Sequence, residues 1–191
     1  MDLHKGDSMT KKKLPPGWEH HFGNLGIRLD IGCGGNKQPN FVGMDLRLLK
    51  GVDIVHDLQK FPWPIPDGIV IQALASHIWE HIEPKNRILW MDEIWRVMKP
   101  EGQLLLSVPY WTSFGAYQDP THYPCPNEAT FTYFDPEYPL YSIYQPKPWK
   151  VVTNDFRYNG NLEVILEKRE AGYTAGKNND KPKSKQKANK K

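Results

Sequence analysis

Apolar positions along this chain cluster in short runs, separated by segments rich in glycine, proline and charged residues. Runs of about four to eight apolar residues bounded by turn signals are typical of strands that a parallel sheet buries on both faces. The run from Ile69 to Ala75 (IVIQALA) is the clearest of them. The pattern predicts five successive strands, at residues 27–31, 41–45, 51–55, 69–75 and 103–109.

One helical pattern interrupts this series. Between residues 84 and 98 the apolar side chains recur at the spacing that one face of a helix requires. Pro84 suits a first helical turn, and Lys99-Pro100-Glu101-Gly102 supplies the residues that usually end a helix. A strand, this helix and the next strand form a crossover between parallel strands, which predicts an α/β fold.

The last part of the chain changes character. Residues 110–148 are aromatic and proline-rich without steady periodicity, apart from a short helix expected at 127–134. Residues 149–158 and 161–168 then form two strand patterns, and Asn159-Gly160 between them is a strong hairpin signal. The sequence therefore predicts a mostly parallel sheet that ends in an antiparallel hairpin after an aromatic insertion.

The length of 191 residues suits one domain with a sizeable core. We expect a flexible N-terminal extension at residues 1–22, the folded domain at 23–170 and a disordered, lysine-rich tail at 171–191. No apolar run approaches the ~20 residues that cross a bilayer, and the polar N-terminus lacks a signal-peptide pattern. The expectation is a cytoplasmic protein with no membrane partner.

The net charge of +3 is unevenly distributed along the chain. Residues 177–191 hold seven lysines and one aspartate, a net +6, which leaves −3 for the remainder. A mildly acidic body is not a nucleic-acid-binding face by its charge. The tail can attract nucleic acid through weak, salt-screened contacts, although such tails more often only aid solubility.

A glycine turn follows the first strand and lies between two carboxylates. The strand ends at Ile31 and runs into Gly32-Cys33-Gly34-Gly35, with Asp30 before the turn and Asp45 at the end of the second strand. Glycines are needed where φ is positive or where a ligand must approach without a Cβ in the way. Carboxyl ends of neighbouring parallel strands face a common crevice, and a carboxylate there can accept both hydrogen bonds of a ribose diol. This stretch predicts a nucleoside-binding site.

Two cofactors compete for this site. A dinucleotide fingerprint needs a third glycine where Lys37 stands, and Asp30 is unfavourable beside a pyrophosphate but favourable beside a cation. The order Asp30-x-Gly32-x-Gly34 followed by Asp45 resembles motif I and the acidic loop of class I S-adenosylmethionine-dependent methyltransferases. The resemblance extends over residues 23–168 and is specific also at 76–82 (SHIWEHI) and 96–102 (RVMKPEG). Residues 119–122 (DPTH) resemble a loop of small bacterial and bacteriophage methyltransferases of unassigned substrate.

The resemblance implies a doubly wound, mostly parallel seven-stranded sheet and a site for S-adenosylmethionine. Asp30 would serve the amino-acid end of the cofactor, Asp45 the ribose and Asp57 the adenine, although an Asp after a strand is more often a turn residue. The family's longer helix before the second acid should here be a short turn. The implied cofactor residues are Asp30, Gly32, Cys33, Gly34, Asp45, Leu46, Asp57, Leu58 and Ser76.

Two histidines are candidates for the catalytic base. The resemblance implies that Ser76 and His77 lie at the end of the fourth strand, beside the reactive methyl group. His122 belongs to the aromatic insertion, which follows a strand whose end faces the same crevice. Either imidazole suits the role because it titrates near neutral pH. The surrounding aromatic side chains either wall off solvent or form a satellite core under the loop: Tyr110, Trp111, Tyr117 and Tyr123.

The segment from His77 to His81 also matches H-x-x-E-H, the inverted zinc-protease motif. That motif needs both histidines on a long helix and a distant third ligand. Here it follows a buried strand directly, and Ile82-Glu83-Pro84 breaks a helix at once, so a zinc hydrolase is a remote alternative. Glu80 and His81 are expected to anchor the following helix. Cys33 and Cys125 lack metal-ligand spacing, so we expect reduced thiols and no metal ligand.

The sequence thus predicts an S-adenosylmethionine-dependent methyltransferase acting on an oxygen or nitrogen of a small-molecule or glycan acceptor. A nucleic-acid methyltransferase guided by the lysine tail is disfavoured, because no Asn/Asp-Pro-Pro-Tyr/Phe element follows the fourth strand. A scaffold that binds cofactor without catalysis is the alternative from another class. The identity of the acceptor and the oligomeric state stay open.

Overall fold

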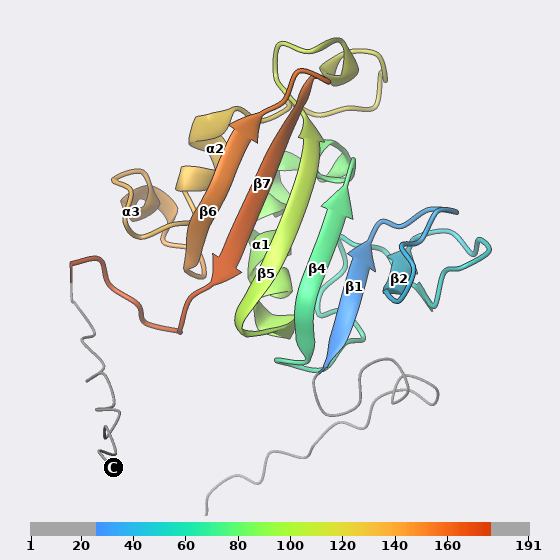
Figure 1. Cartoon of the computed structure of the whole chain (residues 1–191), viewed down its shortest axis with the longest axis horizontal. Helices are drawn as coiled ribbons and strands as arrows, with labels where there is room; N and C mark the ends of the chain where they lie inside the picture. Colours follow the sequence, from blue (N-terminus) through green and yellow to red (C-terminus); the bar gives the residue numbers. More distant parts are fainter. Residues whose placement is uncertain (1–25, 177–191) are drawn as a thin grey trace, which may run out of the picture.

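The computed structural model describes residues 26–176. The N-terminal extension predicted at residues 1–22 and the lysines of the C-terminal tail lie outside this range. Within it, one sheet organises the chain, and the order of its strands is β3-β2-β1-β4-β5-β7-β6 (Figure 1). The strands are β1 (Ile27–Ile31), β2 (Val42–Asp45), β3 (Ile54–Val55), β4 (Val70–Ser76), β5 (Met98–Pro109), β6 (Trp149–Phe156) and β7 (Asn161–Lys168).

The pairing of these strands confirms the predicted fold class. Strands β1 to β5 are parallel to one another. β7 inserts antiparallel between β5 and β6, and it pairs with both over almost its whole length. The result is a seven-stranded, mostly parallel sheet closed by an antiparallel hairpin.

Helices are few in the described chain. The crossover from β4 to β5 holds α1 (Arg87–Val97), which lies behind these two strands in Figure 1. Residues 110–148 contain only the short helices α2 (Glu128–Thr132) and α3 (Tyr141–Tyr144) and a 3₁₀ turn, η4 (Phe114–Ala116). The connection from β1 to β2 is made of turns, as expected for this chain. None of the helices between residues 26 and 176 has the length and apolar character of a bilayer span.

Element boundaries differ from the predictions at a few places. The third strand is confined to residues 54–55, because Val52 and Asp53 hydrogen-bond into the preceding turn and β2. α1 ends at residue 97, and Met98 already pairs with Val70 of β4. The chain then bulges through Glu101, whose φ of 63° is left-handed, before β5 resumes its register at residue 103. The predicted stop signals thus make a bulge within β5 instead of a separate loop.

An aromatic cluster fixes the segment that follows β4. The 3₁₀ turn η2 (Trp79–His81) begins with Trp79, whose side chain is 2% exposed. Its ring lies 6.0 Å from the ring of Trp90 in α1 and 5.1 Å from that of Phe131 in α2. Aromatic pairs at such distances add about 0.5–1.5 kcal/mol each to the energy of burial. η2 is therefore anchored between the crossover helix and the aromatic insertion, and its neighbours Glu80 and His81 are held in place.

Candidate active site

The glycine turn after β1 has one closed side and one open side. Gly32 has a φ of 70°, and a Cβ there would come within 2.7 Å of the Ile78 side chain. At Gly34, with a φ of 54°, the nearest atom to a Cβ would be in Arg47 at 3.9 Å, and at Gly35 nothing lies within 4 Å. The turn thus packs against the end of β4 on one side. On the other side it leaves its backbone accessible to a ligand, as a cofactor cradle requires.

Asp30 lies beneath this turn with 5% of its surface exposed. Its Oδ2 accepts a hydrogen bond of 2.8 Å from the backbone amide of Gln38. Burial raises the pKa of the Asp30 carboxyl, against the opposing effects of the Gln38 amide and of Lys37. A cation bound nearby would favour the ionised form and offset the cost of that burial. The predicted role beside the cationic end of the cofactor is compatible with this environment.

Asp45, at the end of β2, connects the second strand to the glycine turn. Its Oδ2 accepts a hydrogen bond of 2.9 Å from the amide of Gly34, and its Oδ1 accepts one of 2.9 Å from the amide of Arg47. Burial alone would raise the pKa of Asp45, but these amides and the Arg47 guanidinium outweigh it and hold the pKa below its usual range. The carboxylate is therefore ionised at neutral pH. Arg47 Nε also donates to Oδ1 at 3.4 Å, so Oδ2 is the oxygen that keeps a lone pair for a further donor.

The residues after β2 and β3 complete this edge. The amide of His56 donates to the carbonyl of Asp45, which places Asp57 next to the end of β2. Asp57 Oδ1 accepts from the amide of Gln59, so this aspartate does act as a turn residue. The Leu58 side chain is 6% exposed and belongs to the core, so only its backbone can face a ligand, whereas Leu46 is 62% exposed. The predicted cofactor residues of the first three strands thus share one end of the sheet.

His77 follows β4 in an uncommon backbone conformation, with a φ of 54°. Non-glycine residues seldom adopt it, and strained residues of this kind concentrate at functional sites. Its amide donates to the carbonyl of Ser107, and its Nδ1 lies 3.2 Å from Oε1 of Glu80. The Glu80 carboxylate next to Nδ1 raises the pKa of His77, against partial burial that lowers it. Its Nε2 lies 3.3 Å from Nδ2 of Asn161. Ser76, just before it, is exposed.

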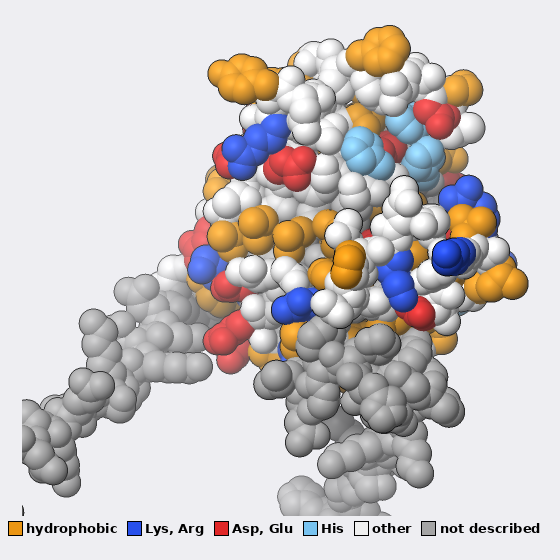
Figure 2. All heavy atoms as spheres, turned by 45° about the vertical axis from the view of Figure 1, so that its right-hand side comes forward, with side chains coloured by type: hydrophobic (Ala, Val, Ile, Leu, Met, Phe, Trp, Pro, Cys, Tyr) orange, Lys and Arg blue, Asp and Glu red, His pale blue; other side chains and the backbone are white. Residues whose placement is uncertain are grey.

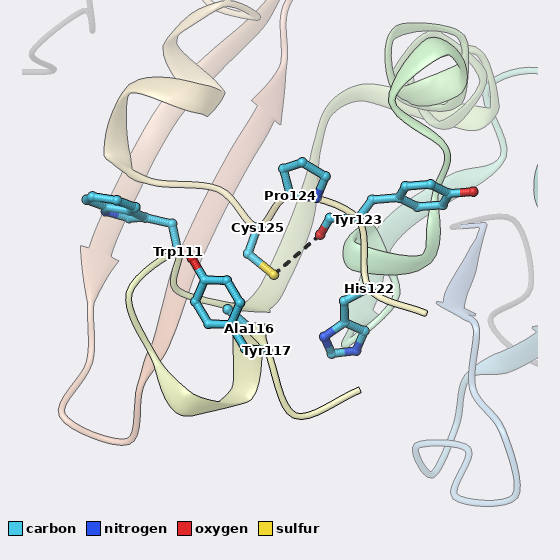
Figure 3. A pocket seen from close by; sticks show the side chains of 7 residues that line it. All are labelled: Trp111, Ala116, Tyr117, His122, Tyr123, Pro124 and Cys125. Atoms are coloured by element: carbon cyan, nitrogen blue, oxygen red, sulfur yellow. Dashed lines mark hydrogen bonds between the residues drawn. The ribbon is translucent and has the colours of Figure 1, made fainter. Parts of the chain in front are cut away.

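The aromatic insertion forms a cavity of about 380 Å³ beside this histidine segment (Figure 3). Three of the four aromatic residues expected to wall off solvent line it, whereas Tyr110 instead packs against Phe156 with a ring distance of 4.6 Å. The backbone amide of Tyr123 donates to the carbonyl of Glu80, which joins the insertion to η2. The lining consists of Trp111, Ala116, Tyr117, His122, Tyr123, Pro124 and Cys125.

The two candidate bases are not equivalent, because His122 lines the cavity and His77 is not among its lining residues. His122 lies against His81, with 4.8 Å between ring centroids, and its Nδ1 is buried without a hydrogen-bond partner among the described residues. His77 has its Nδ1 directed to Glu80, an arrangement that leaves Nε2 as the acceptor in the neutral ring. Sequence reasoning named both histidines and did not foresee that Glu80 lies between them. It assigned Glu80 to anchoring α1.

Other polar residues near His77 were missed. Asn161 Nδ2 donates to Ser107 Oγ at 3.2 Å, and Ser107 Oγ donates to Glu163 at 2.7 Å. Ser107 interrupts an otherwise apolar strand pattern, which is the one sequence signal that could have marked this network. In the sequence, Asn161 and Glu163 are only alternate positions of a predicted hairpin strand.

Both cysteine side chains are protonated thiols at neutral pH. Burial, with Asp30 and Asp45 nearby, raises the pKa of Cys33 to about 11. Burial, with Glu80 nearby, raises that of Cys125 to about 11 as well. Neither is a thiolate nucleophile at neutral pH.

The geometry also differs from that of an inverted zinc protease. His77 and His81 do not share a long helix, since only the three-residue turn η2 follows β4. The side chains that could together hold a metal ion between residues 26 and 176 are Glu80, His81 and His122, whose ligand atoms all lie within 4.8 Å of one another. His77 is not among them.

No known family model matches this sequence. No curated protein matches it either. Solved structures do resemble the fold. A SAM-dependent methyltransferase from Archaeoglobus fulgidus is 18% identical with a TM-score of 0.54, and the match covers 78% of this chain and 88% of that one.

Two further solved structures are similar to this fold. The antibiotic-resistance methyltransferase Kmr is 14% identical with a TM-score of 0.51, covering 78% of this chain and 89% of that one. The [4+2]-cyclase SpnF is 15% identical with a TM-score of 0.53, covering 75% of each chain. Because a cyclase is among the similar structures, the fold does not by itself fix the reaction. The chain has the fold of class I S-adenosylmethionine-dependent methyltransferases.

Proposed function

We propose that this protein is an S-adenosylmethionine-dependent methyltransferase whose acceptor is a hydroxyl or amine group of a small molecule or sugar. The observation that carries the proposal is the contact between Gly32 and Ile78, which brings the open glycine turn next to the histidine segment. A cofactor crevice and a cavity for a second substrate therefore adjoin within one end of the sheet. Similar structures that are methyltransferases support the same assignment.

The residues at the ends of β1 and β2 fit this cofactor. Asp30 is buried and its pKa is raised, so a cation beside it, such as the amino-acid end of the cofactor, would stabilise its charge. The space over Gly34 and Gly35 admits a ligand close to the backbone. The ionised Asp45 has a lone pair left on Oδ2 for a ribose hydroxyl, and the exposed Leu46 offers an apolar contact beside it. When bound, S-adenosylmethionine supplies a methyl group on a positively charged sulfur, which is already activated for transfer to a nucleophile.

The remaining task of the chain is to place the acceptor, exclude water and remove a proton. His77 is the candidate base, because its Nδ1 lies 3.2 Å from the Glu80 carboxylate and its Nε2, which faces Asn161 Nδ2 at 3.3 Å, would receive the proton. Trp111, Tyr117 and Tyr123 line the cavity where the acceptor would lie, and in Figure 3 the Tyr117 ring lies between the other two, which point outward. The flat Tyr117 ring suits a ring-shaped acceptor such as a sugar or an aromatic compound.

The test combines ligand binding with turnover. S-adenosylmethionine and its demethylated product should each raise the melting temperature, because a ligand that binds only the folded state stabilises it by mass action. NADH serves as the control and should cause no shift. Transfer of a radiolabelled methyl group to a panel of hydroxyl- and amine-bearing small molecules would then identify the acceptor. Stabilisation by NADH alone would refute the cofactor assignment, and cofactor binding without transfer to any acceptor would favour a scaffold.

A further inference from the structure

Histidine and carboxylate side chains gather beside the aromatic cavity, and Figure 2 shows histidines close together on one part of the surface. Glu80 and His81 belong to η2, whereas His122 belongs to the insertion that follows β5. The rings of His81 and His122 meet edge to face at 4.8 Å. Two imidazoles and a carboxylate thus converge from distant segments, with ligand atoms within 4.8 Å of one another.

Glu80 is the unusual member of this group. Its side chain is 0% exposed, and neither carboxylate oxygen has a partner with hydrogen-bond geometry in the described part of the chain. The contact with His77 Nδ1, 3.2 Å from Oε1, satisfies the distance of an ion pair only. Burying a carboxylate without full compensation costs several kcal/mol. Oε2 in particular has no hydrogen-bond partner among the described residues.

His122 carries a second unsatisfied atom at the same place. Its Nδ1 is buried and has no hydrogen-bond partner among residues 26–176. Asp119, three residues earlier, lies close enough to His81 and His122 to interact with both electrostatically. The site therefore combines unpaired ligand atoms with local negative charge, and both favour a cation.

We infer that Glu80, His81 and His122 bind a divalent transition-metal ion, Zn²⁺ being the first candidate. Two histidines and one carboxylate form a ligand set that catalytic zinc and other first-row metals use, whereas Mg²⁺ and Ca²⁺ prefer oxygen ligands alone. Ligand distances of about 2.0–2.2 Å need donor atoms roughly 3–3.6 Å apart. The present separations of at most 4.8 Å would close by a modest side-chain adjustment.

Three protein ligands leave at least one coordination position open. His122 also lines the cavity, so a metal ion held by these three residues would adjoin the space assigned to the acceptor. A hydroxyl group bound to it would become more acidic, as water does on zinc, and would lose its proton to a base while the oxygen keeps the electron pair. This role rests on the proposed function, and it narrows the acceptor to a hydroxyl compound.

Metal binding can be tested on the full chain without knowing the acceptor. Protein treated with a chelator and dialysed is titrated with Zn²⁺ by calorimetry and with Co²⁺ by visible absorption. The double variant His81→Ala/His122→Ala should bind Zn²⁺ more than about 10²-fold more weakly, since loss of an outer-shell partner alone costs about 10–100-fold. His56→Ala is the matched control: its ring bonds to the Lys60 carbonyl, and it should bind as wild type.

The design separates this site from other histidines and from the proposed function. His20 and His21 lie outside the described residues, and the double variant keeps them. Equal Zn²⁺ affinity in the double variant and wild type would overturn the inference. Glu80→Gln provides a second variant should the double variant melt early, and it too should lose Co²⁺ absorption. S-adenosylmethionine binding without Zn²⁺ binding refutes only the metal site, whereas the reverse result refutes only the methyltransferase assignment.

Discussion

Replacing Asp45 by alanine tests the cofactor assignment most directly. The substitution leaves two backbone amides, those of Gly34 and Arg47, without their carboxylate acceptor. Each loss is worth about 1–3 kcal/mol, so the free energy of unfolding should fall by about 2–6 kcal/mol. Domains of this size have about 5–15 kcal/mol in total, so the variant should still fold at 25 °C.

The effect on cofactor binding should be separable from this loss. Hydrogen bonds from the ribose to a charged acceptor contribute about 1.5–3 kcal/mol, which is roughly a 10- to 150-fold change in Kd. Calorimetric titration with S-adenosylmethionine, performed well below the melting temperature of the variant, measures this change. Urea denaturation of the same preparation gives the change in unfolding free energy.

Asp53→Ala is the matched control for a loss of folding stability in the same region. Asp53 Oδ2 accepts hydrogen bonds from the amide of Gly43 and from Lys37 Nζ, both 2.7 Å long, next to the glycine turn. This variant should lose stability but keep its Kd within about threefold of wild type. Cofactor binding by Asp45→Ala at wild-type strength would refute the ribose role. An equal loss of affinity in both variants would show that the Asp45 effect is indirect.

Four further outcomes are expected. His77→Asn, which tolerates the left-handed backbone, should lower kcat about 10²–10⁴-fold without changing the Kd for S-adenosylmethionine. Gly35→Val should weaken cofactor binding at nearly unchanged stability, whereas Gly32→Ala, which would clash with a neighbouring side chain, should lower the melting temperature. Trp79→Ala should cost about 3–5 kcal/mol in urea denaturation. Deletion of residues 177–191 should change neither cofactor affinity nor turnover of a small acceptor, and a loss of turnover would implicate the tail.

The sheet was predictable because its signals are local. Apolar strand patterns marked β1, β2, β4 and β5, and Asn159-Gly160 predicted the hairpin between β6 and β7. The seven-stranded layout followed from the resemblance to a known fold, because the runs themselves do not fix the order of the strands. The bulge at Glu101 was not predictable, because residues that usually end a helix can equally form an irregular strand start.

The proximity of the residues proposed to bind the cofactor was predictable for the same reason. Asp30, the glycines and Asp45 lie within one continuous stretch, so their proximity follows from a strand-turn-strand pattern. The acceptor half is assembled from η2, the insertion and β7. No spacing rule relates Glu80 to His122 or His77 to Asn161, because the contacts depend on how the insertion folds back over the sheet.

Glu80 shows why the acceptor half carries the more informative chemistry. In the sequence it is one more charged residue at a helix approach, and most such residues are solvated. In the structure Trp79 packs between α1 and α2, and the next side chain, that of Glu80, is buried in the interior.

A fold selected for stability alone would place an apolar residue at position 80, since replacing buried charges by apolar groups is often neutral or stabilising. The carboxylate instead lies between His77 on one side and His81 and His122 on the other. Local rules that fail at one buried position usually fail for a functional reason. We propose that the reason here is a double role of one carboxylate, which lies beside the candidate base His77 and completes the candidate metal-ligand set near the cavity.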